Sequence, residues 1–259
     1  MYLKILVSND DGISAAGIYQ LVKELKKIGD VIVVAPLTEQ SAAGHSITMK
    51  VPLRVTEHII DGELFGYAVD GTPADCIKMG IKNILKEKPD IVISGINNGS
   101  NAAINVIYSG TVSAAREASI MDVPAIAISV TDHHPKHFEY AAKLSARLAK
   151  LVCINKLKTG TLLNVNVPDL PENEIKGVML TKQGLSKWDD YYEERVDPYG
   201  SKYYWLTGEL LIQDEDIEKD QIALINNYAS ITPVHFDLTD YEMFEKMKSW
   251  DIDSLKLNV

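Results

Sequence analysis

Short apolar runs alternate with segments of helical periodicity over the first two thirds of this 259-residue chain. The runs consist mostly of consecutive Val, Ile and Leu residues, which is typical of strands covered on both faces of a sheet. This alternation predicts an α/β fold with a mostly parallel sheet and helices on both faces. Strands are expected at Lys4–Ser8, Val31–Ala35, Leu64–Val69, Ile91–Ser94, Ala125–Val130 and Thr161–Val167.

Helices are expected between these strands, because their apolar residues recur at helical spacing. The first carries an apolar stripe from Ile18 to Ile28, and Gly29 is expected to end it. The second is expected to begin at Thr72 and Pro73, since Thr is a good N-cap and Pro suits the first turn. Further helices are expected at Thr111–Met121, at Phe138–Val152 and from about Thr239 to Trp250.

The character of the chain changes after about residue 183, where aromatic residues become frequent. Trp188–Tyr192 and Tyr203–Trp205 flank the turn-like residues Asp197–Gly200, which predicts a long β-hairpin. A hairpin cannot bury its aromatic side chains alone, so we expect them to contact another subunit. We therefore expect a core over residues 1–183 and an oligomerisation arm with a C-terminal helix over residues 184–259, in which Ile231–Pro233 returns to the core.

The charge balance excludes one class of partner. With 26 basic and 36 acidic residues the net charge is -10, which argues against binding to a nucleic-acid polymer. A small phosphorylated substrate remains compatible, because a metal ion can supply positive charge. Cys76 and Cys153 lack metal-ligand spacing and are expected to be buried thiols in a reducing compartment. Without a signal-peptide pattern or a membrane-length apolar run, we expect a cytoplasmic protein with no membrane contact.

Two adjacent carboxylates, Asp10 and Asp11, directly follow the first expected strand. In open parallel sheets, ligands bind beyond the carboxyl ends of the strands, which is where this pair falls. Neighbouring carboxylates repel each other unless a cation lies between them or one stays protonated. A hard divalent cation such as Mg²⁺ or Mn²⁺ prefers oxygen ligands and would relieve the repulsion. The alternative is that one aspartate only caps the next helix.

Three further polar segments are expected at strand-to-helix turns: Gln40–Ser46, Ser94–Asn101 and Tyr108–Thr111. Each has an ordinary interpretation as a turn or a helix cap, and the His133-His134 pair and His45 are read as solvent-exposed and loop residues. The N-terminus of the Thr111 helix could instead present backbone amides to a phosphate. Because all four segments can face one crevice, together they indicate a metal and phosphate site.

The same segments resemble the SurE family, the stationary-phase survival proteins that act as metal-dependent nucleoside monophosphate phosphatases. The similarity runs in order from residue 3 to about residue 240, and the hairpin resembles the arm of that family. The matching stretches are Ile5–Gly12, Val34–Pro36 with Gln40-Ser41, Gly44–Thr48, Gly71–Cys76, Ser94–Gly99, Tyr108–Val112, Leu163–Pro168, and Ile231–Pro233 with Asp237–Thr239.

The resemblance implies a phosphoric monoester hydrolase, a 5'- and possibly 3'-nucleotidase with a Rossmann-like core. It also implies one divalent cation per subunit, Mg²⁺ or Mn²⁺, and a homodimer or homotetramer formed through the hairpin and the C-terminal helix. Asp10 is the candidate to orient or deprotonate the attacking water. The implied metal ligands are Asp10, Asp11, Ser41 and Asn97, and the implied phosphate-binding residues are Asn98, Ser109, Gly110 and Thr111.

Two positions depart from the family pattern: Gln40 replaces a basic residue, and Ala103 replaces a glycine. Two alternatives stay open, a metal-binding oligomer with little turnover and a receiver-like phosphorylation switch. The second would need a phosphoacceptor aspartate after a strand about forty residues on, where the chain offers Ser41 and no aspartate before Asp61. The sequence leaves open the base preference, 5' against 3' phosphate, activity on polyphosphate, the physiological metal and the general base.

Overall fold

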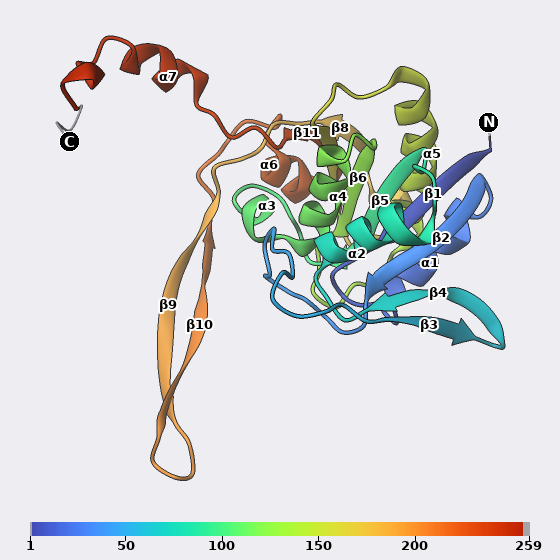
Figure 1. The fold of residues 1–259 in the computed structure, drawn as a ribbon. Helices are drawn as coiled ribbons and strands as arrows, with labels where there is room; N and C mark the ends of the chain where they lie inside the picture. Colours follow the sequence, from blue (N-terminus) through green and yellow to red (C-terminus); the bar gives the residue numbers. More distant parts are fainter. Residues whose placement is uncertain (1, 256–259) are drawn as a thin grey trace.

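The computed structural model describes residues 2–255 and contains a nine-stranded sheet with helices on both faces (Figure 1). The strand order is β3-β4-β2-β1-β5-β6-β7-β11-β8, and the strands from β4 to β7 in this order are parallel to one another, whereas β3 and β11 pair with them antiparallel. The predicted α/β fold class is therefore confirmed. The sheet strands are β1 (Leu3–Ser8), β2 (Gly29–Pro36), β3 (Val55–Ile60), β4 (Glu63–Val69), β5 (Ile91–Asn98), β6 (Ala125–Val130), β7 (Thr161–Val167), β8 (Gly177–Leu180) and β11 (Tyr228–His235).

The helices divide the core into two layers on opposite faces of the sheet. Alternate residues of β1 point to opposite faces. Ile5 and Val7 therefore pack with α1 (Ala16–Leu25) and α5 (Glu139–Asn155), whereas Leu6 packs with α2 (Pro73–Met79) and α4 (Gly110–Ile120). All three side chains are fully buried, as expected for a central strand. The helices are α1 (Ala16–Leu25), α2 (Pro73–Met79, continued by a π-helical turn at Gly80–Ile84), α3 (Asn105–Tyr108), α4 (Gly110–Ile120), α5 (Glu139–Asn155), α6 (Asp220–Ile225) and α7 (Tyr241–Met247), with 3-10 turns at Glu172–Glu174 and Ile252–Leu255.

The strand order creates a switch point between β1 and β5. From β1 the chain builds the sheet in one direction through β2 and β4, and then in the other direction through β5, β6 and β7. Ligands of doubly wound sheets bind in the crevice outside the carboxyl ends of the strands at such a point. The residues after Ser8 and at the end of β5 lie at this crevice, because Ser8 pairs with Ser94.

Several local expectations can be compared with the structure. Thr72 caps α2 as predicted, in a capping box with Asp75, and Pro73 occupies the first turn. Gly29, in contrast, begins β2 and does not end α1, which already stops at Leu25. A side chain at Gly29 would come within 2.1 Å of the Leu3 carbonyl oxygen, so the close pairing of β1 and β2 requires glycine there.

Other expectations were incomplete or wrong. Strands β3 and β8 were not predicted, because their partly exposed side chains do not form a continuous apolar run. The C-terminal helix α7 is shorter than expected and begins after Asp240, whose side chain accepts a hydrogen bond from the Met243 amide. Cys153 is only half-buried, since α5 leaves its side chain near the surface, whereas Cys76 is buried as expected.

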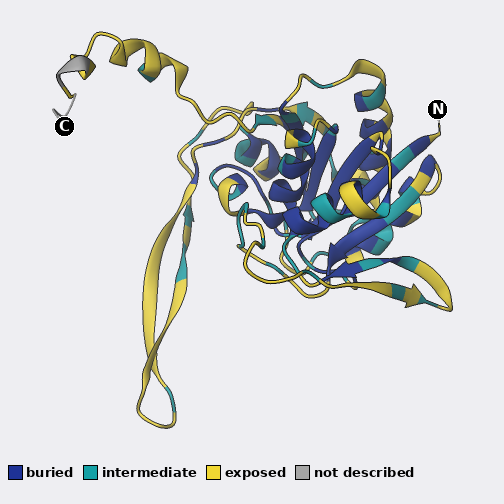
Figure 2. Ribbon diagram, viewed as in Figure 1, coloured by how far each residue is buried: buried dark blue, intermediate teal, exposed yellow. Residues whose placement is uncertain are grey.

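The predicted hairpin is present as a separate two-stranded sheet of β9 (Lys187–Val196) and β10 (Lys202–Leu211). It projects far from the core, and so does the segment that carries α7 (Figure 1). Every residue of β9 is exposed, and Figure 2 shows that nearly all of the hairpin is exposed as well. The strand β11 lies in the main sheet between β7 and β8. Within residues 2–255, no helix has both the length and the apolar character needed to cross a bilayer.

Candidate active site

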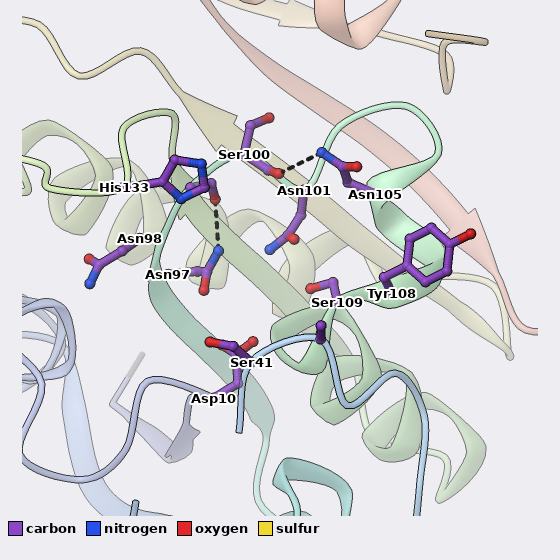
Figure 3. A pocket seen from close by; sticks show the side chains of 12 residues that line it. Asp10, Ser41, Asn97, Asn98, Ser100, Asn101, Asn105, Tyr108, Ser109 and His133 are labelled. Atoms are coloured by element: carbon purple, nitrogen blue, oxygen red, sulfur yellow. Dashed lines mark hydrogen bonds between the residues drawn. The ribbon is translucent and has the colours of Figure 1, made fainter. Parts of the chain in front are cut away.

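A cavity of about 270 Å³ lies at the switch point between β1 and β5. Its walls come from the turn after β1, the loop after β2, the end of β5 with the following loop, and the segment that leads into α4. The four polar segments singled out in the sequence therefore meet in one place (Figure 3). The lining residues are Asp10, Ser41, Ala42, Asn97, Asn98, Gly99, Ser100, Asn101, Asn105, Tyr108, Ser109 and His133.

Asp10 is a buried carboxylate that the N-terminus of α4 holds in place. Its Oδ1 accepts a hydrogen bond from the Thr111 hydroxyl, and Gly110 lies so close that an added Cβ would come within 2.7 Å of the Asp10 side chain. Burial raises the pKa of Asp10, and hydrogen bonds from the side chain and backbone of Thr111 oppose the shift. The carboxylate thus has a fixed orientation, and among residues 2–255 no positive side chain compensates its charge.

Asp11 lies beside the cavity and not among its lining residues. It is half-buried, and its Oδ2 accepts a hydrogen bond of 3.2 Å from the Asn98 backbone amide. Burial and then the charge of Asp10 raise its pKa to about 7. Two adjacent carboxyl groups with raised pKa values are the arrangement that a bound cation stabilises.

Ser41 and Asn97 bring neutral oxygen atoms to the same cavity. The Asn97 side chain donates a 2.7 Å hydrogen bond from Nδ2 to the Gly99 carbonyl, which leaves its amide oxygen on the side of Asp10 (Figure 3). Ser41 is exposed, and its hydroxyl donates to the Glu39 carboxylate, which leaves the oxygen lone pairs available. The loop is tied to the aspartate turn by a 2.8 Å hydrogen bond from the Gln40 amide to the Asp10 carbonyl oxygen.

This donor set fits a hard divalent cation. Carboxylate, amide and hydroxyl oxygens are the ligands that Mg²⁺ and Mn²⁺ prefer. Within residues 2–255 there is no group of three or more His, Cys, Asp or Glu side chains that could hold a metal ion, so a cation here would need the neutral oxygens of Ser41 and Asn97 beside the two carboxylates. No lysine or arginine is found among the described residues that line the cavity, so neither of these cations neutralises Asp10 there.

The four expected phosphate contacts differ in position. Asn98 and Ser109 line the cavity, and Ser109 caps α4 by accepting a 3.0 Å hydrogen bond from the Val112 amide. Gly110 and Thr111 form the first turn behind them, and the buried Thr111 hydroxyl is used by Asp10. This part of the site therefore presents the positive end of a helix of eleven residues toward the buried carboxylate.

The sequence reasoning missed several residues of the site. His133 is exposed, as expected, but it also lines the cavity, because β6 lies next to β5 and its following loop reaches the same edge. Asn105 contacts the cavity from α3, where its Nδ2 donates to the Ser100 carbonyl at 3.3 Å (Figure 3). Glu39 also belongs to the surroundings of the site, because it accepts the hydrogen bond from Ser41 and its charge raises the pKa of Asp10 and Asp11. Its position two residues before Ser41 in the sequence could have suggested this.

The fold and this cavity define a class: a doubly wound α/β protein with an acidic, oxygen-rich site at its switch point. Comparison with known proteins gives the family. The family model described as Survival protein SurE matches residues 5–190, and the chain belongs to the SurE family.

Two relatives and one solved structure are similar to this protein over nearly the whole length of its chain. A protein of Alkaliphilus metalliredigens named 5'-nucleotidase SurE is 47% identical over 253 residues, which cover 97% of this chain and 100% of that protein. Another of the same name from Chlorobaculum tepidum is 44% identical over 250 residues, covering 96% and 95%. The crystal structure of the SurE protein from Aquifex aeolicus has a TM-score of 0.82 and 41% identity, covering 94% of this chain and 98% of that one.

Proposed function

We propose that this protein is a divalent-cation-dependent phosphatase that hydrolyses nucleoside monophosphates. The observation that carries the proposal is the convergence of Asp10, Ser41 and Asn97 on one cavity, with Asp11 beside it. The relatives named 5'-nucleotidase SurE support the substrate class. Membership of this family sets aside the receiver-like alternative.

Asp10, Asp11, Ser41 and Asn97 hold one cation per subunit, Mg²⁺ or Mn²⁺. When bound, the cation would supply Lewis-acid polarisation of a phosphoryl oxygen and would lower the pKa of the attacking water. Asp10 orients the attacking water and accepts its proton, because its carboxylate faces the cavity and is fixed by Thr111. The N-terminus of α4 stabilises negative charge on the transferring phosphoryl group, with Ser109 and Asn98 as the nearest side chains.

The nucleoside occupies the part of the cavity away from Asp10. Its lining there combines amide side chains, at Asn101 and Asn105, with the rings of Tyr108 and His133. Amides suit the hydroxyl groups of ribose, and exposed rings on a cavity rim suit contact with a base. Tyr108 is 59% exposed, so its ring is accessible for such a contact.

The assembly is a homodimer or homotetramer formed by the hairpin and the C-terminal helix. The hairpin exposes Tyr191, Tyr192, Tyr204 and Trp205, which a monomer leaves in contact with water. Light scattering after size exclusion tests this proposal. Trp205→Lys should shift the molecular mass toward the monomer, and a wild-type protein that elutes as a monomer would reject it.

Charge and thiol content support two further parts of the proposal. The net charge of -10 opposes binding to a nucleic-acid polymer. Both cysteines are free thiols, which fits a reducing, cytoplasmic location. The division into residues 1–183 and residues 184–259 also remains a proposal.

Phosphate release is the direct test. Purified protein is incubated with 5'- and 3'-nucleoside monophosphates and polyphosphate, each with Mn²⁺ or Mg²⁺, and inorganic phosphate is measured. Asp10→Asn should abolish release, whereas the exposed control Asp70→Asn should not. Cation binding without phosphate release from any substrate would favour the second candidate, a metal-binding oligomer with little turnover, for which Gln40 in place of a basic residue is the only hint.

A further inference from the structure

The segment between β2 and β3, residues 37–54, has neither helix nor strand, yet it carries Ser41. A metal ligand on such a segment needs anchors, since an unrestrained loop would lose conformational entropy on binding. One anchor precedes Ser41, where the Gln40 amide donates to the Asp10 carbonyl at 2.8 Å. A second follows it, where the Gly44 amide donates to the Tyr108 carbonyl at 3.1 Å.

The next residue, His45, forms the first side-chain anchor after Ser41. Its Nε2 lies 2.9 Å from Oε2 of Glu117, and the Glu117 side chain is only 4% exposed. The other carboxylate oxygen of Glu117 lies 2.5 Å from Lys78 Nζ on α2. Although burial favours the neutral acid, the hydrogen bonds from His45 and Lys78 hold the pKa of Glu117 below its usual value.

Glu117 belongs to α4, the same helix whose first turn fixes the carboxylate of Asp10 through Thr111. A single rigid element thus contacts Asp10 directly and the Ser41 loop through His45. Two hydrogen bonds farther along the loop attach it to α2 and its cap. The Thr72 hydroxyl donates to the Ser46 carbonyl, and the Thr48 amide donates to the Asp75 carboxylate. They hold the distal half of the loop, whereas His45 holds the half next to Ser41.

We propose that the contact between His45 and Glu117 positions Ser41 relative to Asp10 and thereby sets the affinity of the site for its divalent cation. The inference rests on the proposed metal site. His45 and Glu117 are positioning residues, because neither lines the cavity. Partners that orient metal ligands typically change metal affinity by about 10- to 100-fold when they are removed.

A matched pair of substitutions at His45 tests the contact. His45→Leu keeps a similar volume but cannot hydrogen-bond to Glu117, whereas His45→Gln retains a nitrogen donor. Lys78→Met removes the other partner of Glu117 without touching the loop and controls for general damage around the buried carboxylate. Binding of Mn²⁺ is measured by the loss of the free-ion EPR signal, alongside thermal unfolding of the metal-free proteins and kcat and KM at saturating Mn²⁺.

We expect about tenfold weaker Mn²⁺ binding in His45→Leu, near-normal binding in His45→Gln and Lys78→Met, and a kcat that recovers at saturating Mn²⁺. A purely structural role would lower the unfolding temperature of His45→Leu without changing its Mn²⁺ affinity, and that result would overturn the inference. Equal weakening by His45→Leu and Lys78→Met would overturn it as well. Wild-type protein that binds no Mn²⁺ would reject the metal site itself and, with it, this inference.

Discussion

Asp11→Asn should stabilise the metal-free protein while it weakens cation binding. In the folded chain the pKa of Asp11 is raised from 3.8 to about 7, first by burial and then by the charge of Asp10. A carboxyl with a raised pKa binds protons more tightly when folded, so stability falls as pH rises from the unfolded value toward the folded one. Asparagine does not ionise, and its amide oxygen can still accept the hydrogen bond from the Asn98 amide.

The size of the stabilisation expected for Asp11→Asn follows from the shift in the pKa of Asp11. One pKa unit corresponds to about 1.4 kcal/mol, so a rise from 3.8 to about 7 gives an upper bound of about 4 kcal/mol above neutral pH. Asp11 is only partly buried, so solvent screening reduces the expected gain to about 2 kcal/mol. Below about pH 4 both states are protonated and the gain should vanish.

The assay is urea unfolding of chelator-treated protein between about pH 5 and pH 8, repeated with saturating Mn²⁺. Metal-free wild type should lose stability as pH rises, whereas Asp11→Asn should show a flatter profile. Added Mn²⁺ should stabilise wild type far more than the variant, because a ligand that binds only the folded state adds stability that grows with the logarithm of its concentration divided by Kd, and the variant has the larger Kd. Asp70→Asn, at an exposed aspartate, is the control. A metal-free Asp11→Asn protein that is less stable than wild type near pH 8 would refute the reasoning.

Three further predictions concern single contacts. Thr111→Val removes the hydroxyl that donates to buried Asp10, so urea unfolding should show a loss of about 1.5–3 kcal/mol and kcat should fall. His133→Ala removes a ring at the cavity rim, so KM should rise for nucleotides but not for phosphate esters of small alcohols; equal changes would place the ring at the phosphate. Ala103 has φ of 51°, so Ala103→Gly should stabilise the protein by up to about 1 kcal/mol in thermal unfolding, because relief of the left-handed backbone outweighs the greater freedom of unfolded glycine; an unchanged or lower unfolding temperature would contradict this.

Much of the central fold was predictable because its signals are local. The parallel strands consist of consecutive apolar residues, and the capping box at Thr72 needs only four neighbouring residues. The strand order was not predictable, since it depends on which apolar faces pack together after the chain has folded. Strands β3 and β8 were not predicted, because many of their side chains are exposed and the two segments show no continuous apolar pattern.

The residues of the candidate site were likewise predictable where the signal was local, and not where it depended on the arrangement of the strands. Asp10 and Asp11 could be singled out because two adjacent carboxylates after a buried strand carry an electrostatic cost. The sequence also suggested Ser41 and Asn97 as turn residues, although their roles as ligands came from the family resemblance. His133 could not be placed, because its position at the cavity depends on β6 lying next to β5.

Hydrogen bonds also link the base of the hairpin to the cavity, across the division predicted at residue 183. Trp188 donates from Nε1 to Asn105 Oδ1 at 3.1 Å, and Asn105 lines the cavity. The Asp220 carboxylate accepts bonds from the amides of Ala103 and Gly184, at 3.0 and 2.9 Å. The loop between β5 and α4, which carries half of the cavity wall, is therefore hydrogen-bonded both to the base of the hairpin and to the first residue of α6. Ala103, whose φ is 51°, lies in this loop, so hydrogen bonds join two parts of the molecule that the change in composition after residue 183 separates along the chain.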